Sequence, residues 1–370
     1  MSLLPVLHVA SGRLYGGIER MLTTLAEFGQ DRFEFAVAAD GRLLSELRER
    51  GARVQFLGDV RLRHPSSILR ARHLLGSALR TRQPSSVVCH APWSHALFAG
   101  VARSRGVPVV LWQHDRATGA TLVERACRAA GADLVISNSS WSARTAAILQ
   151  PHAPCRIIHC PVASIAVADG ERARIRSTLG ASPGHVVVLA ASRLEPWKGH
   201  LNLIRALASL PSRPWTLWIA GGAQRAHERR HLTAIEAEIR RLGVESRVTL
   251  LGERRDVRNL LAGADLLAQA NVEPEPFGVI FAEALLAGVP VVTTDMGGAP
   301  EIVASSCGRL VGPGDFSALT AALDELISDD RLRHALGSAG QAHAASRCDP
   351  AVVLPQIDRA VSSIGVTTAA

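Results

Sequence analysis

The chain has 370 residues, longer than one ordinary domain, and its 47% apolar content is enough for two hydrophobic cores. The net charge is +8, which allows anionic partners such as phosphates, nucleic acid or a membrane surface. No apolar run approaches the roughly 18 residues that span a bilayer, and the first ten residues carry no basic signal-peptide segment. These features argue against a membrane-spanning protein and predict a soluble, cytoplasmic one.

Short β-rich runs alternate with helical stretches along the whole chain. Helical patterns include Ile18–Phe28, Glu228–Leu242 and Phe277–Ala287. This alternation predicts two doubly wound α/β domains of the Rossmann-like kind, each with a parallel sheet covered on both faces. The candidate strands are Leu3–Ala10, Phe33–Ala39, Arg53–Leu57, Ser86–Cys89, Pro108–Gln113, Leu134–Ser137 and Arg156–His159, then His185–Ala191, Trp215–Ala220, Val248–Leu250, Asp265–Gln269, Val289–Thr293 and Gly308–Val311.

The join between the domains is predicted at Pro161 to Gly170, where small residues show no strong period. We therefore expect an N-terminal domain over 1–163, a C-terminal domain over 171–350, and a last segment, 351–370. That segment is expected to form a helix over Val352–Ser362 and a flexible tail from Gly365. Ligands of open parallel sheets bind beyond the carboxyl ends of the strands, so the loops there are the places to look for chemistry.

The first strand leads into a glycine-containing loop that opens a helix. The loop has no Gly-x-Gly-x-x-Gly, and Ile18 stands where a P-loop would need lysine, so neither nucleotide motif is present. What remains is the pair Gly16 and Gly17. Glycines let backbone approach a ligand, and a helix N-terminus offers free N–H groups to an anion, but a plain tight turn explains the pair equally well.

The excess positive charge lies in the N-terminal part of the chain. Residues 1–165 contain 20 arginines and 11 acidic residues, and ten of these arginines lie between Arg42 and Arg82. Apolar residues recur among them at near-helical spacing, namely Ile68, Leu69, Leu74, Leu75 and Leu79. This part of the basic segment 42–82 therefore predicts a basic amphipathic helix, which either packs on the core with a solvated charged face or docks on an anionic membrane.

Two further features of this half are candidates for a functional site. His114 follows a predicted strand, at its carboxyl end, so it is a candidate site residue, although a structural histidine is equally common there. Cys155 and Cys160 have His152 and His159 nearby, but the spacing matches no common zinc motif. We therefore expect ordinary thiols and no metal site.

The segment from Ser192 to His200 follows a strand and carries two cations, Arg193 and Lys198, on a loop that enters a helix. Two cations at such a loop suit a diphosphate, to which each charge-assisted hydrogen bond contributes about 1.5–3 kcal/mol. The chain contains 40 arginines and a single lysine, Lys198. Because lysine is otherwise avoided, this one is expected to supply a functional point charge, and a chance surface lysine is the alternative.

The segment from Glu273 to Leu285 is the most informative part of the chain. Glu275 and Glu283 are separated by seven residues, and Gly278 lies where a backbone N–H can meet a phosphate or a sugar. Glu283 lies in an otherwise apolar helical pattern, where a carboxylate needs a partner. The two hydroxyls of a ribose would satisfy it.

Together these segments resemble the family 4 retaining glycosyltransferases of the GT-B fold, of the bacterial polysaccharide and glycoconjugate type. The resemblance covers nearly the whole chain, most strongly residues 185–311 and least 40–110. It rests on the Glu-x-Phe-Gly…Glu motif that begins at Glu275, on the run from Gly288 to Ile302, and on Gly-Gly-Ile-Glu from Gly16.

The resemblance implies a hexosyltransferase-type enzyme that moves a sugar from a UDP- or GDP-sugar to an acceptor with retention. The nucleotide would bind the C-terminal domain and the acceptor the N-terminal one, with the last helix crossing back to it. The implied catalytic residues are Arg193, Lys198, His114 and Glu275. The implied donor-binding residues are Gly16, Gly17, Ser192, Phe277, Gly278, Val279 and Glu283.

No cofactor or metal is expected. The chain contains no Asp-x-Asp, the motif with which many transferases hold a divalent ion, and two fixed cations can stabilise the departing diphosphate instead. The acceptor is expected to be a sugar, a lipid-linked carrier at the inner membrane face, or a small soluble metabolite.

Three other functions stay open on the sequence alone. A nucleotide-sugar epimerase or hydrolase could use the same fold, and so could a nucleotide-sugar sensor without activity. A nucleic-acid binder is disfavoured because few aromatic residues accompany the arginines, so no nucleic-acid partner is expected.

Overall fold

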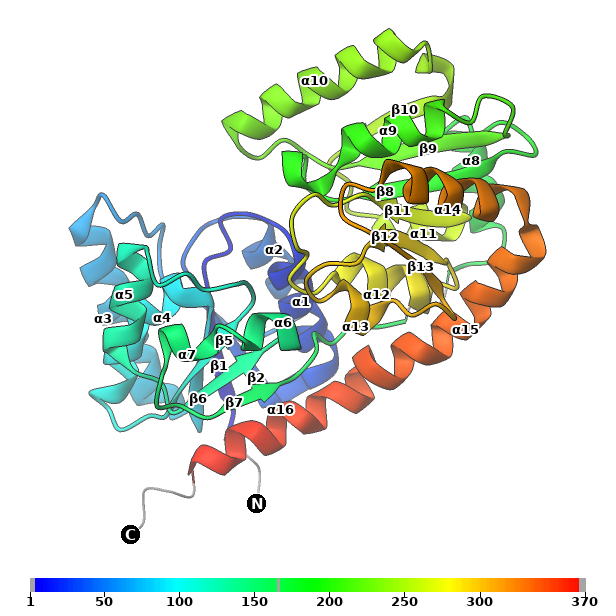
Figure 1. Ribbon diagram of the computed structural model, residues 1–370. Coiled ribbons are helices and arrows are strands. Elements are labelled where there is room, and N and C mark those ends of the chain that lie inside the picture. The colour runs from blue at the N-terminus through cyan, green and yellow to red at the C-terminus, as the bar shows by residue number, and fades with distance from the viewer. Residues whose placement is uncertain (1–3, 165–166, 366–370) are drawn as a thin grey trace. The chain divides into compact units, whose positions relative to one another are not determined.

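The computed structural model describes residues 4–164 and 167–365, and the chain divides into two compact units (Figure 1). Unit 1 comprises Met1–Val162 and Pro350–Ala370, and unit 2 comprises Ala163–Asp349. The boundary after Val162 falls within the predicted join, of which residues 165–166 lie outside the described part. The tail predicted from Gly365 also lies outside it from residue 366 onwards.

Unit 1 is built on a seven-stranded parallel sheet with the order β3-β2-β1-β4-β5-β6-β7. Its strands are β1 (Val6–Ala10), β2 (Phe33–Val37), β3 (Val54–Phe56), β4 (Ser86–His90), β5 (Val109–Gln113), β6 (Leu134–Ser137) and β7 (Cys155–Ile157). Its helices are α1 (Gly17–Gly29), η1 (Gln30–Arg32), α2 (Arg42–Glu49), α3 (Pro65–Arg82), α4 (Ala91–Arg103), α5 (Leu122–Ala130), α6 (Ser140–Ala143), α7 (Ala146–Leu149) and α16 (Pro350–Gly365).

Unit 2 is built on a six-stranded parallel sheet with the order β10-β9-β8-β11-β12-β13. Its strands are β8 (Val186–Ala191), β9 (Trp215–Ala220), β10 (Val248–Gly252), β11 (Leu266–Gln269), β12 (Val291–Thr294) and β13 (Gly308–Val311). Its helices are α8 (Glu171–Thr178), η2 (Pro196–Lys198), α9 (His200–Ala208), α10 (Ala226–Leu242), η3 (Glu245–Arg247), α11 (Val257–Gly263), α12 (Val279–Leu286), α13 (Ala299–Ile302), α14 (Phe316–Ser328) and α15 (Asp330–Cys348). The prediction of two doubly wound parallel-sheet domains is confirmed.

Prolines and a glycine account for the main differences from the predicted boundaries. β1, β5 and β12 each begin directly after a proline, at Pro5, Pro108 and Pro290, because proline has no N–H to donate to a neighbouring strand. The helix predicted from Phe277 begins two residues later. Gly278 precedes it with a left-handed φ of +88°, which ends the extended segment and starts the helix.

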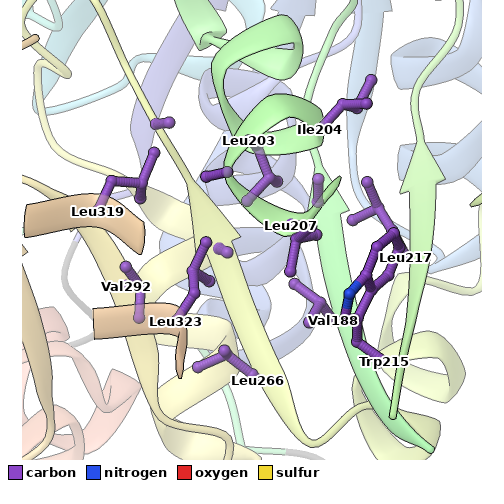
Figure 2. Packing of buried hydrophobic residues seen from close by; sticks show 14 of the residues in the cluster. Val188, Leu203, Ile204, Leu207, Trp215, Leu217, Leu266, Val292, Leu319 and Leu323 are labelled. Atoms are coloured by element: carbon purple, nitrogen blue, oxygen red, sulfur yellow. The ribbon is translucent and has the colours of Figure 1, made fainter. Parts of the chain in front are cut away.

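The core of unit 2 lies between its sheet and the helices that cover it. Figure 2 shows Leu203 and Leu207 of α9 packed toward Val188 of β8, with Leu319 and Leu323 of α14 beside them. Each of the five is almost fully buried. Burial of one such side chain stabilises the fold by about 1.5–3 kcal/mol, so this layer holds the strands in place.

Helix α3 lies in the segment predicted to be a basic amphipathic helix. Ala71, Leu75 and Leu79 are buried against the sheet of unit 1, so the helix packs on the core. Leu69, which the apolar stripe was expected to include, is 67% exposed. Arg70 and Arg72 are exposed next to it.

The last helix, α16, belongs to unit 1 although it follows the whole of unit 2 in the sequence. It packs against α1, and Asp358 pairs with Arg32 at 2.8 Å. None of the helices in residues 4–164 and 167–365 is both long and apolar enough to cross a bilayer.

Both sheets reverse their strand order at one place. In unit 1 the reversal lies between β1 and β4, and in unit 2 it lies between β8 and β11. The loops that leave neighbouring strands there diverge to opposite faces of the sheet and leave room for a ligand. The functional residues are therefore expected at these two switch points.

Candidate active site

At the switch point of unit 2, the loop after β8 and the loop after β11 meet through an ion pair. Lys198, the last residue of η2, places its Nζ 2.5 Å from Oε2 of Glu275, and both side chains are 12% exposed. Lys198 Nζ also lies 3.9 Å from the centre of the Trp197 ring. The two charged residues of the sequence motifs are thus brought together, each largely withdrawn from water.

The carboxylate of Glu275 has an uneven set of partners. Oε2 accepts hydrogen bonds from Lys198, from Gln269 Nε2 at 3.1 Å and from Asn271 Nδ2 at 3.5 Å. No hydrogen bond joins Oε1 to another described residue. One oxygen therefore fixes the side chain, and the other keeps its capacity to accept hydrogen bonds.

Two glycines let the loops of this site come close together. A Cβ at Gly199 would lie 1.6 Å from the carbonyl oxygen of Ala270, and one at Gly297 would lie 2.1 Å from that of Glu275. Gly298 N donates to the same Glu275 oxygen at 2.7 Å. Any side chain at Gly199 or Gly297 would push the loops apart, so the glycines fix the position of the Lys198–Glu275 pair.

Arg193 is held by two carboxylates of unit 2. Its Nη1 lies 2.6 Å from Oε1 of Glu195 and 3.3 Å from Oε1 of Glu228, whose side chain is fully buried. Burial alone would raise the pKa of Glu195, but the Arg193 charge and the Trp197 N–H outweigh it and hold that pKa below its ordinary value. Arg193 therefore neutralises carboxylates of its own unit.

Glu195, Glu228 and His227 are close enough to raise the question of a metal. Their ligand atoms lie within 4.8 Å of one another, the one such grouping in the described ranges. Glu228 also accepts the backbone N–H groups of Gln224 and Arg225, which cap α10. Because the Arg193 guanidinium bonds both carboxylates, a cation there would have to displace a cation already in place.

The remaining donor-binding candidates of unit 2 surround the start of α12. Phe277 is buried and anchors the loop, Gly278 precedes the helix, and Val279 is half-buried in its first turn. Glu283 lies one turn further on and is half-buried. On the other loop, Ser192 Oγ lies 3.1 Å from Nε2 of His200, which fixes the start of α9.

In unit 1 the loop after β1 carries Gly16 and Gly17 to the start of α1. Gly16 adopts an extended conformation that any residue accepts, and a Cβ there would meet only Glu19 Oε2 at 3.8 Å. The protein's own packing therefore does not require glycine at this position. The glycine that the turn does require is Gly12, which has φ +71° and where a Cβ would lie only 2.7 Å from Cγ1 of Val37.

Tyr15, the one tyrosine of the chain, ties this loop to α2. Its Oη donates to Oε2 of Glu46 at 2.5 Å, and the Arg42 guanidinium lies 3.6 Å from its ring centre. Burial and the Glu46 carboxylate raise the pKa of Tyr15 to about 12, so it stays a donor at all ordinary pH values. Nothing in the sequence motifs had singled this residue out.

His114 follows β5 and is 7% exposed. Its Nε2 lies 2.9 Å from Nδ1 of His90, and Nε2 of His90 lies 2.9 Å from Nδ1 of His8. Burial lowers the pKa of His8 and of His114 to about 3 and that of His90 well below its ordinary value, so all three rings are neutral. The sequence motifs pointed to His114 alone and missed His8 and His90.

The one signal that could have found them is the strand order. His8 lies in β1 and His90 ends β4, and these strands flank the switch point of unit 1. Each strand was predicted, but their adjacency follows from the fold and not from their place in the chain.

Chemically, unit 2 offers a partly buried ammonium, a carboxylate with one unbonded oxygen and closely approaching backbone. Such a set can bind an anion next to a polyhydroxyl compound. Unit 1 offers neutral ring nitrogens and an open glycine loop.

Both halves of the chain are similar to known glycosyltransferases. The model described as "Glycosyltransferase Family 4" matches residues 15–164, and the model described as "Glycosyl transferases group 1" matches residues 171–343. Over 184 residues the chain is 34% identical to the GDP-mannose-dependent monoacylated alpha-(1-6)-phosphatidylinositol monomannoside mannosyltransferase of Corynebacterium glutamicum, a match that covers 47% of this chain and 46% of that protein.

Two further proteins are similar. The D-inositol 3-phosphate glycosyltransferase of Nocardia farcinica is 35% identical over 184 residues, which cover 48% of this chain and 40% of that protein. The matched segment thus spans less than half the length of either curated relative. The crystal structure of Anabaena HepE in complex with UDP and glucose has a TM-score of 0.85 and 28% identity, and it covers 97% of this chain and 100% of that one.

The GT-B fold expected from the motifs is confirmed by this last likeness. One family model matches each half, and together they cover nearly all of residues 15–343. The family resemblance that the motifs predicted is confirmed by these two matches.

Proposed function

We propose that this protein transfers a sugar from a nucleoside-diphosphate sugar to an acceptor. The observation that carries the proposal is the Lys198–Glu275 pair at the switch point of unit 2. Lys198 is the single lysine in the chain, and its ammonium is held at the carboxyl end of β8 with little exposure to water. An ammonium so placed is ready to receive the negative charge of a departing diphosphate.

Glu275 is proposed to bind the transferred sugar. Its Oε2 is engaged by Lys198, Gln269 and Asn271, whereas Oε1 has no described partner. A carboxylate oxygen with this freedom accepts hydrogen bonds from sugar hydroxyls. The pair would therefore contact both sides of the bond that breaks. Lys198 would bind the leaving phosphate, and Glu275 would bind the transferred sugar.

Glu283 is proposed to bind the ribose of the nucleotide. It lies on α12 one turn after Val279, and its neighbours Ala282 and Ala284 are buried. A half-buried carboxylate at this place can accept both ribose hydroxyls. Phe277, Gly278 and Ser192 would complete the donor site through backbone and packing.

The reaction is proposed to need no metal ion. Arg193 would aid Lys198 at the diphosphate after exchanging its bond to Glu195 for one to a phosphate oxygen. The Glu195–His227–Glu228 group already has Arg193 as its counter-charge, which supports a structural role for it. The anomeric configuration is proposed to be retained, as the family resemblance implies.

The donor is proposed to carry uridine or guanosine. The mannosyltransferase of Corynebacterium glutamicum is named for GDP-mannose, and HepE was solved with UDP and glucose. We assign the acceptor to unit 1, next to the open loop at Gly16 and Gly17 and to His114. The preferred acceptor is a lipid-linked or glycoconjugate one.

The activity test is a panel of UDP- and GDP-sugars incubated with the full chain, with and without membrane lipid extract, with the products read by mass spectrometry. Transfer of a hexose to an acceptor, lost at least tenfold in Lys198→Ala, supports the proposal. Rapid consumption of donor without an acceptor would instead identify a hydrolase or epimerase. Arg230→Ala, which removes an exposed cation of α10, is the matched control.

The lipid-linked acceptor is supported by the surface of unit 1. Leu62 and Leu69 are 51% and 67% exposed, and Arg61, Arg63, Arg70 and Arg72 are exposed around them. Apolar side chains within a basic cluster favour a peripheral position on an anionic membrane.

This part of the proposal has its own test. Cosedimentation with phosphatidylglycerol vesicles should exceed that with phosphatidylcholine vesicles, and Leu62→Asp/Leu69→Asp should abolish the difference. The control is Leu122→Asp, because Leu122 on α5 is also exposed, at 80%. Equal binding to both vesicles, or to neither, would leave the soluble metabolite as the acceptor.

A further inference from the structure

Three histidines form a continuous hydrogen-bonded row across the sheet of unit 1. His8 comes from β1, His90 from the end of β4 and His114 from the residue after β5, three strands that are neighbours at the switch point. The two bonds, His8 Nδ1 to His90 Nε2 and His90 Nδ1 to His114 Nε2, are both 2.9 Å long. We call His8, His90 and His114 the histidine row.

The bonds restrict where the ring protons can be. Each neutral imidazole carries one N–H, so the row has three protons. Two of them lie in the two hydrogen bonds, because each bond needs one donor. The third proton must be at one end of the row, either on Nε2 of His8 or on Nδ1 of His114.

The His8 end is a poor place for a proton. Nε2 of His8 is buried and has no hydrogen-bond partner in the described part of the chain, and the ring packs against Phe33 and Phe35. A proton there would be an orphan donor among apolar side chains, and orphan buried N–H groups are rarer than orphan acceptors.

The His114 end is different. No described residue makes a hydrogen bond with Nδ1 of His114, and this atom is not completely buried. His114 is also the member of the row at the carboxyl end of the sheet, where ligands bind. A proton on Nδ1 of His114 can therefore reach a ligand atom.

We propose that His8 and His90 are positioning residues that hold His114 as the neutral Nδ1–H tautomer, which donates a hydrogen bond to an oxygen of the acceptor bound at unit 1. The inference rests on the proposed glycosyl transfer. Neutrality matters there because the acceptor oxygen becomes more positive as it forms the new glycosidic bond, and an imidazolium beside it would oppose that charge. A neutral donor orients the acceptor without this penalty.

The backbone next to His90 supports a fixed orientation for this ring. Ala91, the first residue of α4, has φ +71°, a conformation that non-glycine residues rarely adopt. Ser94 Oγ donates to the carbonyl oxygens of His90 and Ala91, at 2.5 and 3.0 Å. Strain of this kind persists where the surroundings over-determine the backbone, and it is frequent at functional sites.

Two substitutions at His114 separate the proposal from a structural role. An asparagine amide occupies the position of Nδ1, and a glutamine amide that of Nε2. His114→Asn therefore keeps the donor toward the ligand, and His114→Gln keeps only the bond to His90. We expect kcat/KM of His114→Asn to be at least tenfold higher than that of His114→Gln, with the difference in kcat. If His114 only accepted the hydrogen bond from His90, kcat/KM of His114→Gln would be the higher one, and this result would overturn the proposal.

The tautomers can be read in the unmodified protein by nitrogen-15 NMR of the histidine rings, with signals assigned through His8→Asn, His90→Asn and His114→Asn. All three rings should show a protonated Nδ1 and a bare Nε2 at pH 7. A protonated Nε2 on His90 or His114, or a charged ring, would refute the row. This readout needs no activity, so the Nδ1–H tautomers would stand even if glycosyl transfer itself were disproved.

Discussion

The two switch points of this protein are built from opposite kinds of side chain. In unit 2 the loops after β8 and β11 bring together ion-pairing side chains, Lys198 with Glu275 and Arg193 with Glu195 and Glu228. In unit 1 the strands at the same topological place carry neutral, stacked rings, with His90 and His114 beside Trp112. The net positive charge of the N-terminal half, +9 over residues 1–165, lies elsewhere on that unit.

The difference shows that overall charge is a poor guide to the charge of a site. Unit 2 is nearly neutral in sum, yet it holds the ammonium that can meet a diphosphate. Unit 1 is strongly basic, yet its buried row has no charge. A transferase needs this division, since the leaving group becomes negative and the sugar positive. The following predictions test it, beginning with the largest effect.

Arg193→Met should destabilise the protein by about 3 kcal/mol, because it leaves the buried Glu228 carboxylate and Glu195 without their main counter-charge. Urea denaturation at pH 7 measures the change in the free energy of unfolding. The double variant Arg193→Met/Glu228→Gln should recover much of the loss, since glutamine keeps an acceptor for the cap of α10. Wild-type stability in Arg193→Met would show that these carboxylates do not depend on Arg193 for their counter-charge.

Glu283→Ala should raise KM for the nucleotide sugar about 10–50-fold and leave kcat within threefold. Ribose binding is equally strong in the ground state and the transition state, so its loss affects binding more than turnover. Steady-state kinetics with a saturating acceptor give both constants. Glu245→Ala, which removes an exposed carboxylate of unit 2, should change neither. A fall in kcat alone would contradict the ribose assignment.

The neutral histidine row makes the protein sensitive to acid. The pKa of His8 and of His114 is about 3 in the folded protein and 6.5 when the ring is exposed, so below pH 6.5 the unfolded chain binds protons that the native one does not. Stability from these rings is complete above pH 6.5 and is lost as the pH falls toward 3, at about 1.4 kcal/mol per pH unit for each ring.

His8→Asn removes one of the rings that bind a proton only in the unfolded chain. Between pH 6 and 4 its free energy of unfolding should therefore fall less steeply than that of the wild type, by about 1.4 kcal/mol per pH unit. Urea titrations at several pH values compare the slopes. His64→Asn, at an exposed histidine, is the matched control and should keep the wild-type slope. Parallel slopes for His8→Asn and the wild type would show that the row is protonated in the native state.

The smallest expected effect concerns Ala91. Glycine accepts φ +71° without strain, so Ala91→Gly should raise the free energy of unfolding by roughly 0.5–1 kcal/mol. Gln83→Gly provides the control, because Gln83 has a left-handed φ of +46° at the end of α3. If the strain at Ala91 serves to orient His90, Ala91→Gly should also lower kcat and Gln83→Gly should not. Equal kcat in both variants would make the strain incidental.

Most of the fold could be predicted from the sequence. All thirteen strands of the described residues lie at predicted β-rich runs, because buried parallel strands are short and apolar and are separated by helices. The ends were less certain: proline moved the starts of β1, β5 and β12, and Gly278 moved that of α12. These residues act through single N–H groups and single φ angles, which periodicity does not register.

The site could be predicted only where a local motif carried it. Lys198 and Glu275 were both selected from their own loops, but nothing in the sequence indicated that they form a pair. Their contact depends on β8 and β11 being neighbours, which only the strand order determines. His8 and His90 were missed for the same reason, as each looks like an ordinary strand residue until the strands are set side by side.

The measurement that tests the central claim most directly is calorimetric binding of nucleoside diphosphates and monophosphates to the wild type and to Lys198→Ala. If the Lys198 ammonium meets the diphosphate, the affinity for UDP or GDP should fall about 10–150-fold in the variant, the equivalent of a 1.5–3 kcal/mol charge-assisted bond. The affinity for the corresponding monophosphate should stay within threefold. An unchanged diphosphate affinity, or an equal loss for both nucleotides, would contradict the account.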